Sequence, residues 1–174
     1  AAASLSVAEN STAVTTVTAS DADLPAQTLT YSISGGADAA SFSIDVNSGV
    51  LAFMVAPNHE APADANADNI YVVIVQASDG SFTGTQTLSV TVTNVNEAPA
   101  ITSNGGGASA SVSAAENQTA VTTVTSTDVD GGTNVYSIAG GADAALFTID
   151  ASTGVLRFTA APNFEATSDS GGNN

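Results

Sequence analysis

Residues 70–93 read IYVVIVQASDGSFTGTQTLSVTVT, and this stretch decides the fold. Its apolar residues alternate along the chain, so that one face of each half carries Tyr71, Val73, Val75 and Ala77, and then Leu88, Val90 and Val92. Alternation with a period of two is typical of half-buried antiparallel strands. The Asp79-Gly80 pair between the halves is a turn signal. The stretch therefore predicts two strands joined by a turn, each with one buried face.

The rest of the first 100 residues likewise consists of strand-forming runs separated by turn signals. Thr-Val runs at 14–18 are β-branched and unsuited to a helix, and turn signals recur at Gly35-Gly36 and Ser48-Gly49. No segment has helical periodicity over three turns. About seven short strands in this length, separated by such turns, indicate an all-β fold of the β-sandwich type. We expect the core to include Phe42, Ile44, Leu51 and Phe53, and in a second copy Phe147, Ile149, Leu156 and Phe158.

An internal repeat organises the chain. SVAENSTAVTTVTASDAD at 6–23 is matched by SAAENQTAVTTVTSTDVD at 113–130, and YSISGGADAASFSIDVNSGVL at 31–51 by YSIAGGADAALFTIDASTGVL at 136–156. We assign a first repeat to residues 4–99, a Gly-rich linker to 100–108 and a second repeat to 109–174. The linker contains Gly105 to Gly107, which predicts a flexible joint.

The second copy stops before the equivalents of Ile70 to Val95, which supply the last two strands of the first copy. Without them a sandwich would expose apolar strand edges. Two interpretations are open. The chain is a fragment of a longer array in which the strands follow, or a neighbouring molecule donates the strands and so builds a filament.

The acidic residues follow the repeat. Seven of them recur at equivalent positions, namely Glu9, Asp21, Asp23, Asp38, Asp45, Glu60 and Asp64 as Glu116, Asp128, Asp130, Asp143, Asp150, Glu165 and Asp169. The net charge is −16 although only 10% of residues are charged, because Arg157 is the only residue among Lys and Arg. Carboxylates at fixed places without basic partners indicate a hard divalent cation.

The same composition excludes several functions. Nucleic acid is not expected as a partner because nothing neutralises phosphates, and an anionic membrane would repel the chain. No stretch approaches the ~20 apolar residues of a membrane-spanning helix. The amino end lacks the basic and apolar regions of a signal peptide. With its abundant Ala, Thr, Ser, Val and Gly, the sequence is interpreted as a mature or internal segment of an exported bacterial surface protein.

The order of the motifs resembles a known family. AEN at 8–10, DAD at 21–23, YSI at 31–33, FSIDVNSGVL at 42–51, a loop with Glu60, QASDG at 76–80 and NVNEAP at 94–99 together resemble a cadherin-type repeat, in the bacterial cadherin-like branch of large surface adhesins. The resemblance implies tandem seven-strand Greek-key sandwiches of the cadherin or immunoglobulin type, the second incomplete. It also implies calcium at the joint between consecutive repeats.

Carried over by motif, the resemblance assigns the ligands of the joint to Glu9, Glu60, Asn94, Asn96 and Glu97 from the first repeat, with Asp128 and Asp130 from the second. By the same logic Asp21, Asp23 and Asp79 would face a preceding repeat, and Glu116 and Glu165 a following one. The family linker usually carries more aspartates than Asn94 to Ala98, so we expect fewer ions and looser binding. Asp38, Asp45 and their equivalents are interpreted as turn residues.

The sequence contains few residues of the types that usually serve in catalysis. His59 is the only histidine and no cysteine is present, so a nucleophilic triad would rest on His59, which we expect to face solvent. Aromatic content of 5% without Trp is poor for a sugar-binding platform. We therefore expect no enzyme, but a secreted or cell-surface module that is stiffened by calcium and is structural or adhesive. Its partners would be neighbouring repeats of the same or identical chains, and a cell-surface protein or glycan. A strand-donating filament subunit and a carbohydrate-binding module are the alternatives.

Overall fold

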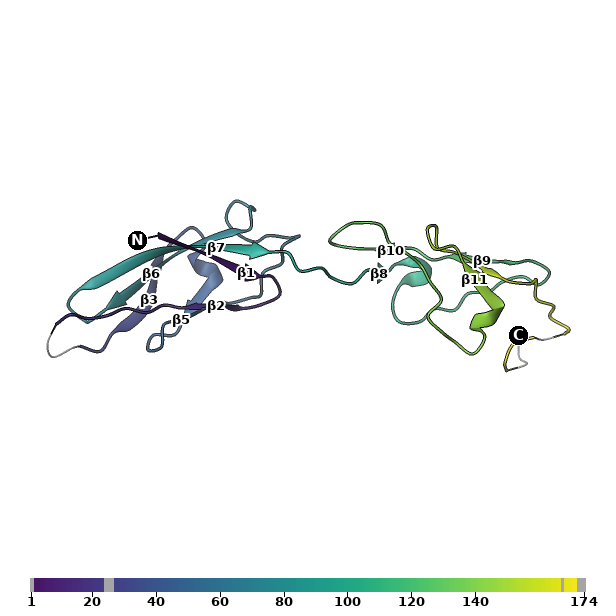
Figure 1. The fold of residues 1–174 in the computed structure, drawn as a ribbon, viewed down its shortest axis with the longest axis horizontal. Helices are drawn as coiled ribbons and strands as arrows, with labels where there is room; N and C mark the ends of the chain where they lie inside the picture. Colours follow the sequence, from purple (N-terminus) through teal and green to yellow (C-terminus); the bar gives the residue numbers. More distant parts are fainter. Residues whose placement is uncertain (1, 24–26, 167, 172–174) are drawn as a thin grey trace. The chain divides into compact units, whose positions relative to one another are not determined.

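The computed structural model describes residues 2–23, 27–166 and 168–171. The chain forms two compact units, unit 1 over residues 1–95 and unit 2 over residues 96–174. The described residues form β-strands and short 3₁₀ turns, with no α-helix among them (Figure 1). None of the described helical turns has the length and apolar character needed to cross a membrane.

The elements of unit 1 are β1 (Ala2–Ala8), β2 (Ala13–Thr16), β3 (Thr30–Gly35), η1 (Ala39–Ser41), β4 (Phe42–Ile44), β5 (Val50–Phe53), β6 (Ile70–Ser78) and β7 (Thr83–Thr93). They form two sheets, with strand orders β1-β7-β6-β3 and β2-β5-β4. Strand β1 pairs with β7 in parallel, and the other pairs are antiparallel. The predicted seven-strand β-sandwich is therefore confirmed for unit 1.

The core of unit 1 lies on the faces that the sequence alternation predicts. In β6 and β7, Val73 and Val90 are fully buried, and Tyr71 is 2% exposed. Leu51 and Phe53 of the opposite sheet pack against them, and the Tyr71 ring meets Phe53 edge-on with centroids 5.0 Å apart. Each such side chain stabilises the fold by about 1.5–3 kcal/mol. The hairpin of β6 and β7 is therefore the main apolar cover of the smaller sheet.

The turn between β4 and β5 is determined locally. Asp45 accepts the backbone N–H of Ser48 at 2.7 Å, and Gly49 has φ of +72°. A Cβ on Gly49 would overlap the carbonyl oxygen of Val17. In unit 2, Asp150 and Gly154 build the same turn, with φ of +69° at the glycine. Asp45 and Asp150 are thus turn residues, as predicted.

Asp38 has a larger role than the predicted turn residue. It is 5% exposed, and it accepts the backbone N–H of Ala65 on Oδ1 at 2.6 Å and that of Val72 on Oδ2 at 2.7 Å. These donors lie in the loop before β6 and near the start of β6. The carboxylate therefore joins three separate segments, and the local-turn interpretation is wrong for Asp38.

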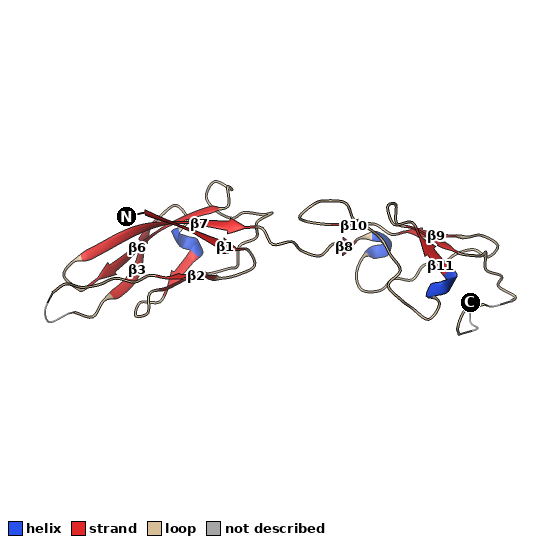
Figure 2. Cartoon of the chain, viewed as in Figure 1, coloured by secondary structure: helices blue, strands red, loops and turns tan. Residues whose placement is uncertain are grey.

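Unit 2 has β8 (Ala100–Ile101), η2 (Ser103–Gly105), β9 (Ala120–Thr123), β10 (Ser126–Thr127), η3 (Ala144–Leu146), β11 (Phe147–Ile149) and β12 (Val155–Phe158). Its sheets have the orders β10-β8 and β11-β12-β9, and Figure 2 shows how much of this unit is loop. The described part contains no strand at 109–115 or 135–140, the equivalents of β1 and β3. In unit 1 those two strands pair with β7 and β6. The described part of unit 2 thus contains no counterpart of the β1-β7-β6-β3 sheet.

Candidate metal centre

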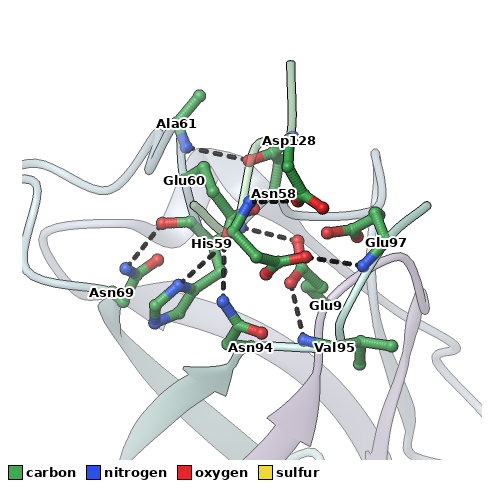
Figure 3. A network of polar contacts seen from close by, with 11 residues as sticks. Glu9, Asn58, His59, Glu60, Ala61, Asn69, Asn94, Val95, Glu97 and Asp128 are labelled. Atoms are coloured by element: carbon green, nitrogen blue, oxygen red, sulfur yellow. Dashed lines mark hydrogen bonds and ion pairs between the residues drawn. The ribbon is translucent and has the colours of Figure 1, made fainter. Parts of the chain in front are cut away.

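Three segments of unit 1 meet at the end where the chain leaves β7. Glu9 follows β1, Glu60 lies in the loop between β5 and β6, and Asn94 follows β7 (Figure 3). Glu9 is fixed by its backbone, because its N–H donates to the carbonyl of Thr93 at 3.0 Å. Asn10 then turns the chain away with φ of +60°, a conformation that asparagine tolerates better than most residues.

Glu9 is a buried carboxylate, with 2% of the residue exposed. Its Oε2 accepts the backbone N–H of His59 at 2.9 Å, and its Oε1 accepts that of Val95 at 2.8 Å (Figure 3). Hydrogen bonds from backbone N–H groups favour the charged form of a carboxylate. Glu9 therefore ties the Glu60 loop to the residues that follow β7.

Glu60 places a second carboxylate beside Glu9. Its Oε1 accepts a hydrogen bond from Asn94 Nδ2 at 2.8 Å and lies 3.2 Å from His59 Nδ1. Its Oε2 is buried, and no hydrogen-bond donor reaches it within the described residues. One carboxylate oxygen of each glutamate lies within 4.8 Å of the other. A buried acceptor without a donor is costly, so this oxygen points to a cation as its missing partner.

His59 lies in the loop beside this site, with its side chain partly exposed to solvent. Its side chain is 35% exposed, and Asn69 Nδ2 donates to its carbonyl oxygen at 2.9 Å. Both its backbone groups thus hold the loop in place. The backbone N–H donors at Glu9 were not foreseen from the sequence, because their spacing carries no motif.

Unit 2 holds the other group of predicted ligands. Asp130 Oδ2 accepts the backbone N–H of Glu97 at 2.6 Å, and Asp128 Oδ1 accepts that of Asp130 at 3.1 Å. Asn96 donates from Nδ2 to the carbonyl of Glu97 at 2.9 Å. Within unit 2, the loop that carries Asp128 and Asp130 is therefore hydrogen-bonded to Glu97, at the start of the unit.

A further acidic cluster lies in unit 1. Asp21, Asp23 and Asp79 each place a carboxylate oxygen within 4.8 Å of the others. The N–H groups of Phe82 and Ser81, both at 2.6 Å, lower the pKa of the Asp79 carboxyl. The structure thus brings together the three residues that the resemblance assigned to one joint.

Glu116 and Glu165 of unit 2 are exposed. Glu116 accepts the N–H of Phe164 at 3.0 Å, the bond that Glu9 makes to His59. The N–H of Glu165 donates to Asn163 Oδ1 at 2.9 Å. No cluster of three acidic groups in the described part of the chain includes either glutamate.

Residues 3–93 match the family model of the cadherin domain. That match covers half of the sequence, and the chain belongs to the cadherin domain family. Cadherin domains are extracellular adhesion modules without enzymatic activity. The predicted membership of this family is confirmed. No curated protein matches the chain.

Two solved structures with TM-scores of 0.50 or more agree on the fold. Human protocadherin-24 EC1-2 has 19% identity and a TM-score of 0.57, over 95% of this chain and 77% of that one. The protocadherin gammaB7 EC3-6 cis-dimer structure has 25% identity and a TM-score of 0.50, over 95% and 44%. Protocadherin gamma B2 extracellular cadherin domains 3-6 have 26% identity and a TM-score of 0.49, over 91% and 42%. The chain thus spans less than half of the two gamma protocadherin structures.

Proposed function

We propose that the chain is a calcium-stiffened repeat module of a secreted or cell-surface protein, acting in a stalk, an adhesin or an extracellular filament. The observation that carries this proposal is the buried Oε2 of Glu60, which no donor reaches among the described residues, beside the buried carboxylate of Glu9. Abundant Ala, Thr, Ser, Val and Gly with almost no Lys support a bacterial surface protein as the source.

The chemistry of the ligand set favours calcium. Carboxylates and amide oxygens are hard ligands, and Ca²⁺ accepts six to eight of them in flexible geometry. Sites for zinc would use His or Cys, and this chain has one histidine and no cysteine. The proposed ligands at the joint are Glu9, Glu60, Asn94, Asn96, Glu97, Asp128 and Asp130. The Asp21, Asp23 and Asp79 cluster would serve a preceding repeat, and Glu116 and Glu165 a following one.

Chain connectivity supports a shared site. Val95 donates its N–H to Glu9, and Glu97 donates its N–H to Asp130, with only Asn96 between them. Consecutive Cα atoms are about 3.8 Å apart, so two residues span less than ~8 Å whatever the angle at the joint. An ion held by Glu9 is therefore within reach of Glu97. Such an ion would restrict the hinge at Asn96.

The stiffening follows from linkage. A ligand at ten to a hundred times its dissociation constant stabilises the state that binds it by about 1–3 kcal/mol. Extracellular calcium modules have dissociation constants around 10⁻⁴–10⁻³ M. Millimolar calcium outside cells would then populate the stiff state, and calcium at cytosolic levels would not.

Calorimetric titration with calcium, paired with X-ray scattering in calcium and in chelator, tests the proposal. We expect heat of binding and a narrower distribution of particle dimensions in calcium. Glu60→Gln should weaken binding tenfold or more, whereas Asp45→Asn, in a turn of its own, should not. Equal scattering in both buffers, with no heat, would refute the calcium mechanism.

A second candidate function is assembly by strand donation, in which a neighbouring chain completes unit 2. An open apolar groove in that unit favours it. Sedimentation velocity of the chain over a range of concentrations tests it, with concentration-dependent growth as the expected result. The adhesive partner in either case would be a further repeat, a cell-surface protein or a glycan.

A further inference from the structure

The larger sheet of unit 1, with the order β1-β7-β6-β3, turns one face to the core and the other to solvent. On β6, alternation places Ile70, Val72 and Ile74 on the outer side, away from the core. Ile70 is 38% exposed, and the other two are partly buried. The strand is thus apolar on both faces from residue 70 to residue 75. An uninterrupted apolar run of this kind is typical of a strand that is covered on both faces.

Hydroxyl side chains flank this outer stripe of Ile70, Val72 and Ile74. The register sets the outward residues of β7 directly opposite the stripe, namely Thr87, Ser89 and Thr91. The outward serines of β1 lie beyond them, and β3 adds serine and threonine at the other edge of the sheet. Threonine presents a methyl group beside its hydroxyl. The outer face can therefore pack against another surface without burying a charge.

The charges of unit 1 lie elsewhere. None of the four strands contains Asp, Glu, Lys, Arg or His. The acidic residues of the unit all lie in the segments between strands, and they are Glu9, Asp21, Asp23, Asp38, Asp45, Glu60, Asp64, Asp68 and Asp79. Unit 1 has no Lys or Arg to offset them. Two copies of the unit therefore repel each other through their loops, whereas the outer face of the larger sheet brings no carboxylate of its own to a contact.

The chemistry of the face selects its partner. An acidic or a basic protein would find no charge to pair with on these strands. A sugar would find no aromatic ring to stack on, because the outward positions of the four strands hold only Ala, Ser, Thr, Val, Ile and Gln. A second copy offers the same aliphatic stripe and the same hydroxyl rows. The face is thus complementary to itself, as a two-fold symmetric interface requires.

The size of the face fits a weak dimer. The four strands are 7, 11, 9 and 6 residues long. With ~3.3 Å between residues along a strand and ~4.8 Å between strands, the face covers roughly 500 Å². Two such faces would bury roughly 1,000 Å² in all, at the lower end of specific interfaces. We expect a dissociation constant on the order of 10⁻⁴ M.

We propose that the outer face of the β1-β7-β6-β3 sheet is a contact surface for a second copy of this chain, packed face to face about a two-fold axis. The inference deepens the proposed function, because it names the surface through which identical chains pair side by side. Chains stiffened by calcium would hold several such weak contacts together, and linked contacts bind far more tightly than single ones.

Sedimentation equilibrium of the full chain, at concentrations up to about 10⁻³ M, tests the contact. We expect a monomer–dimer equilibrium that strengthens with added salt, because salt screens the repulsion between the acidic loops. Ser89→Glu, opposite Val72 at the middle of the sheet, should weaken the dimer tenfold or more, since it places like charges on both sides of the contact. Val50→Glu adds the same charge to β5 of the smaller sheet, at a residue that is 47% exposed, and should leave the dimer unchanged.

A charge exchange keeps the test independent of the folding of any one variant. Ser89→Lys alone should also weaken the dimer, and an equal mixture of Ser89→Glu and Ser89→Lys should restore it, which misfolded chains could not do. The inference is overturned if the chain stays monomeric, if Val50→Glu weakens the dimer as much as Ser89→Glu, or if the mixture does not associate. Association that Ser89→Glu leaves unchanged also overturns it, and then another surface assembles the chain. Calorimetric titration with calcium does not involve Ser89, so each of these outcomes leaves the calcium proposal standing.

Discussion

Replacing Glu9 by alanine tests how unit 1 is closed at the end where the chain leaves β7. The substitution leaves two backbone N–H groups, those of His59 and Val95, without their acceptor. Each unsatisfied buried donor costs about 1–3 kcal/mol. Because water can enter the space left by the side chain, we expect a loss of about 2–4 kcal/mol in the free energy of unfolding of unit 1.

That loss is a large fraction of the ~5–15 kcal/mol that stabilises a typical domain. A change of 3 kcal/mol lowers the Tm of a domain of this size by roughly 12–24 °C. Urea unfolding in chelator measures it without the contribution of calcium. Tyrosine fluorescence reports mainly on unit 1, because Tyr31 and Tyr71 lie there and only Tyr136 lies in unit 2.

Asp23→Ala is the matched control. It removes the same charge from the same unit at an exposed position, so in chelator it should change the unfolding free energy by no more than about 0.5 kcal/mol. If Glu9→Ala proves as mild as Asp23→Ala, the two hydrogen bonds do not close the unit and the structural role given to Glu9 is wrong.

Three further outcomes are expected. Gly49→Ala should cost about 2–4 kcal/mol in the free energy of urea unfolding, because φ is +72° there and a Cβ would overlap backbone. Gly84→Ala, inside β7 with open space around it, should be neutral or stabilise by up to about 1 kcal/mol, and equal losses at the two positions would contradict the assignment. The N–H of Ser48 is the main group that lowers the pKa of Asp45 below 3.8. The stability that Asp45 contributes is therefore present above that pH and is lost as the pH falls through the folded-state pKa. Asp45→Asn should flatten the dependence of the unfolding free energy on pH between 2 and 5, and an unchanged slope would contradict this role of Asp45. Chelation should lower the Tm measured in 2 mM calcium by several degrees, as about 1–3 kcal/mol of linkage requires, and magnesium should not restore it.

The sequence was sufficient wherever the determining interaction is local or periodic. The alternation at Val73 and Val90 predicts the buried faces of the hairpin correctly, because side chains on a strand alternate whatever lies around it. Asp45 and Gly49 fix their turn through bonds within five residues. These features need no knowledge of the rest of the fold.

Interactions between segments that are distant along the chain could not be predicted from the sequence. Asp38 accepts its bonds from residues 27 and 34 positions away, and it was mistaken for a local turn residue. Glu9 meets donors 50 and 86 positions away. The motif resemblance pointed to Glu9 as a ligand, but backbone N–H groups carry no residue type, so no pattern of letters could reveal them.

Comparison of the two units shows which hydrogen bonds of these acidic residues need the larger sheet and which do not. In unit 2, Asp143 still binds Ser170, and Glu116 still binds Phe164, although residues 109–115 and 135–140 form no strand. The hydrogen bond that each carboxylate accepts from a loop residue therefore forms without the larger sheet. In unit 1 the other hydrogen bond to each carboxylate is supplied by Val72, which lies in β6, and by Val95, which follows β7. Those N–H groups belong to the hairpin and to the residue that follows it. Asp38 and Glu9, already positioned by their loop-side bonds, therefore specify the register in which the hairpin packs on the apolar face of the smaller sheet.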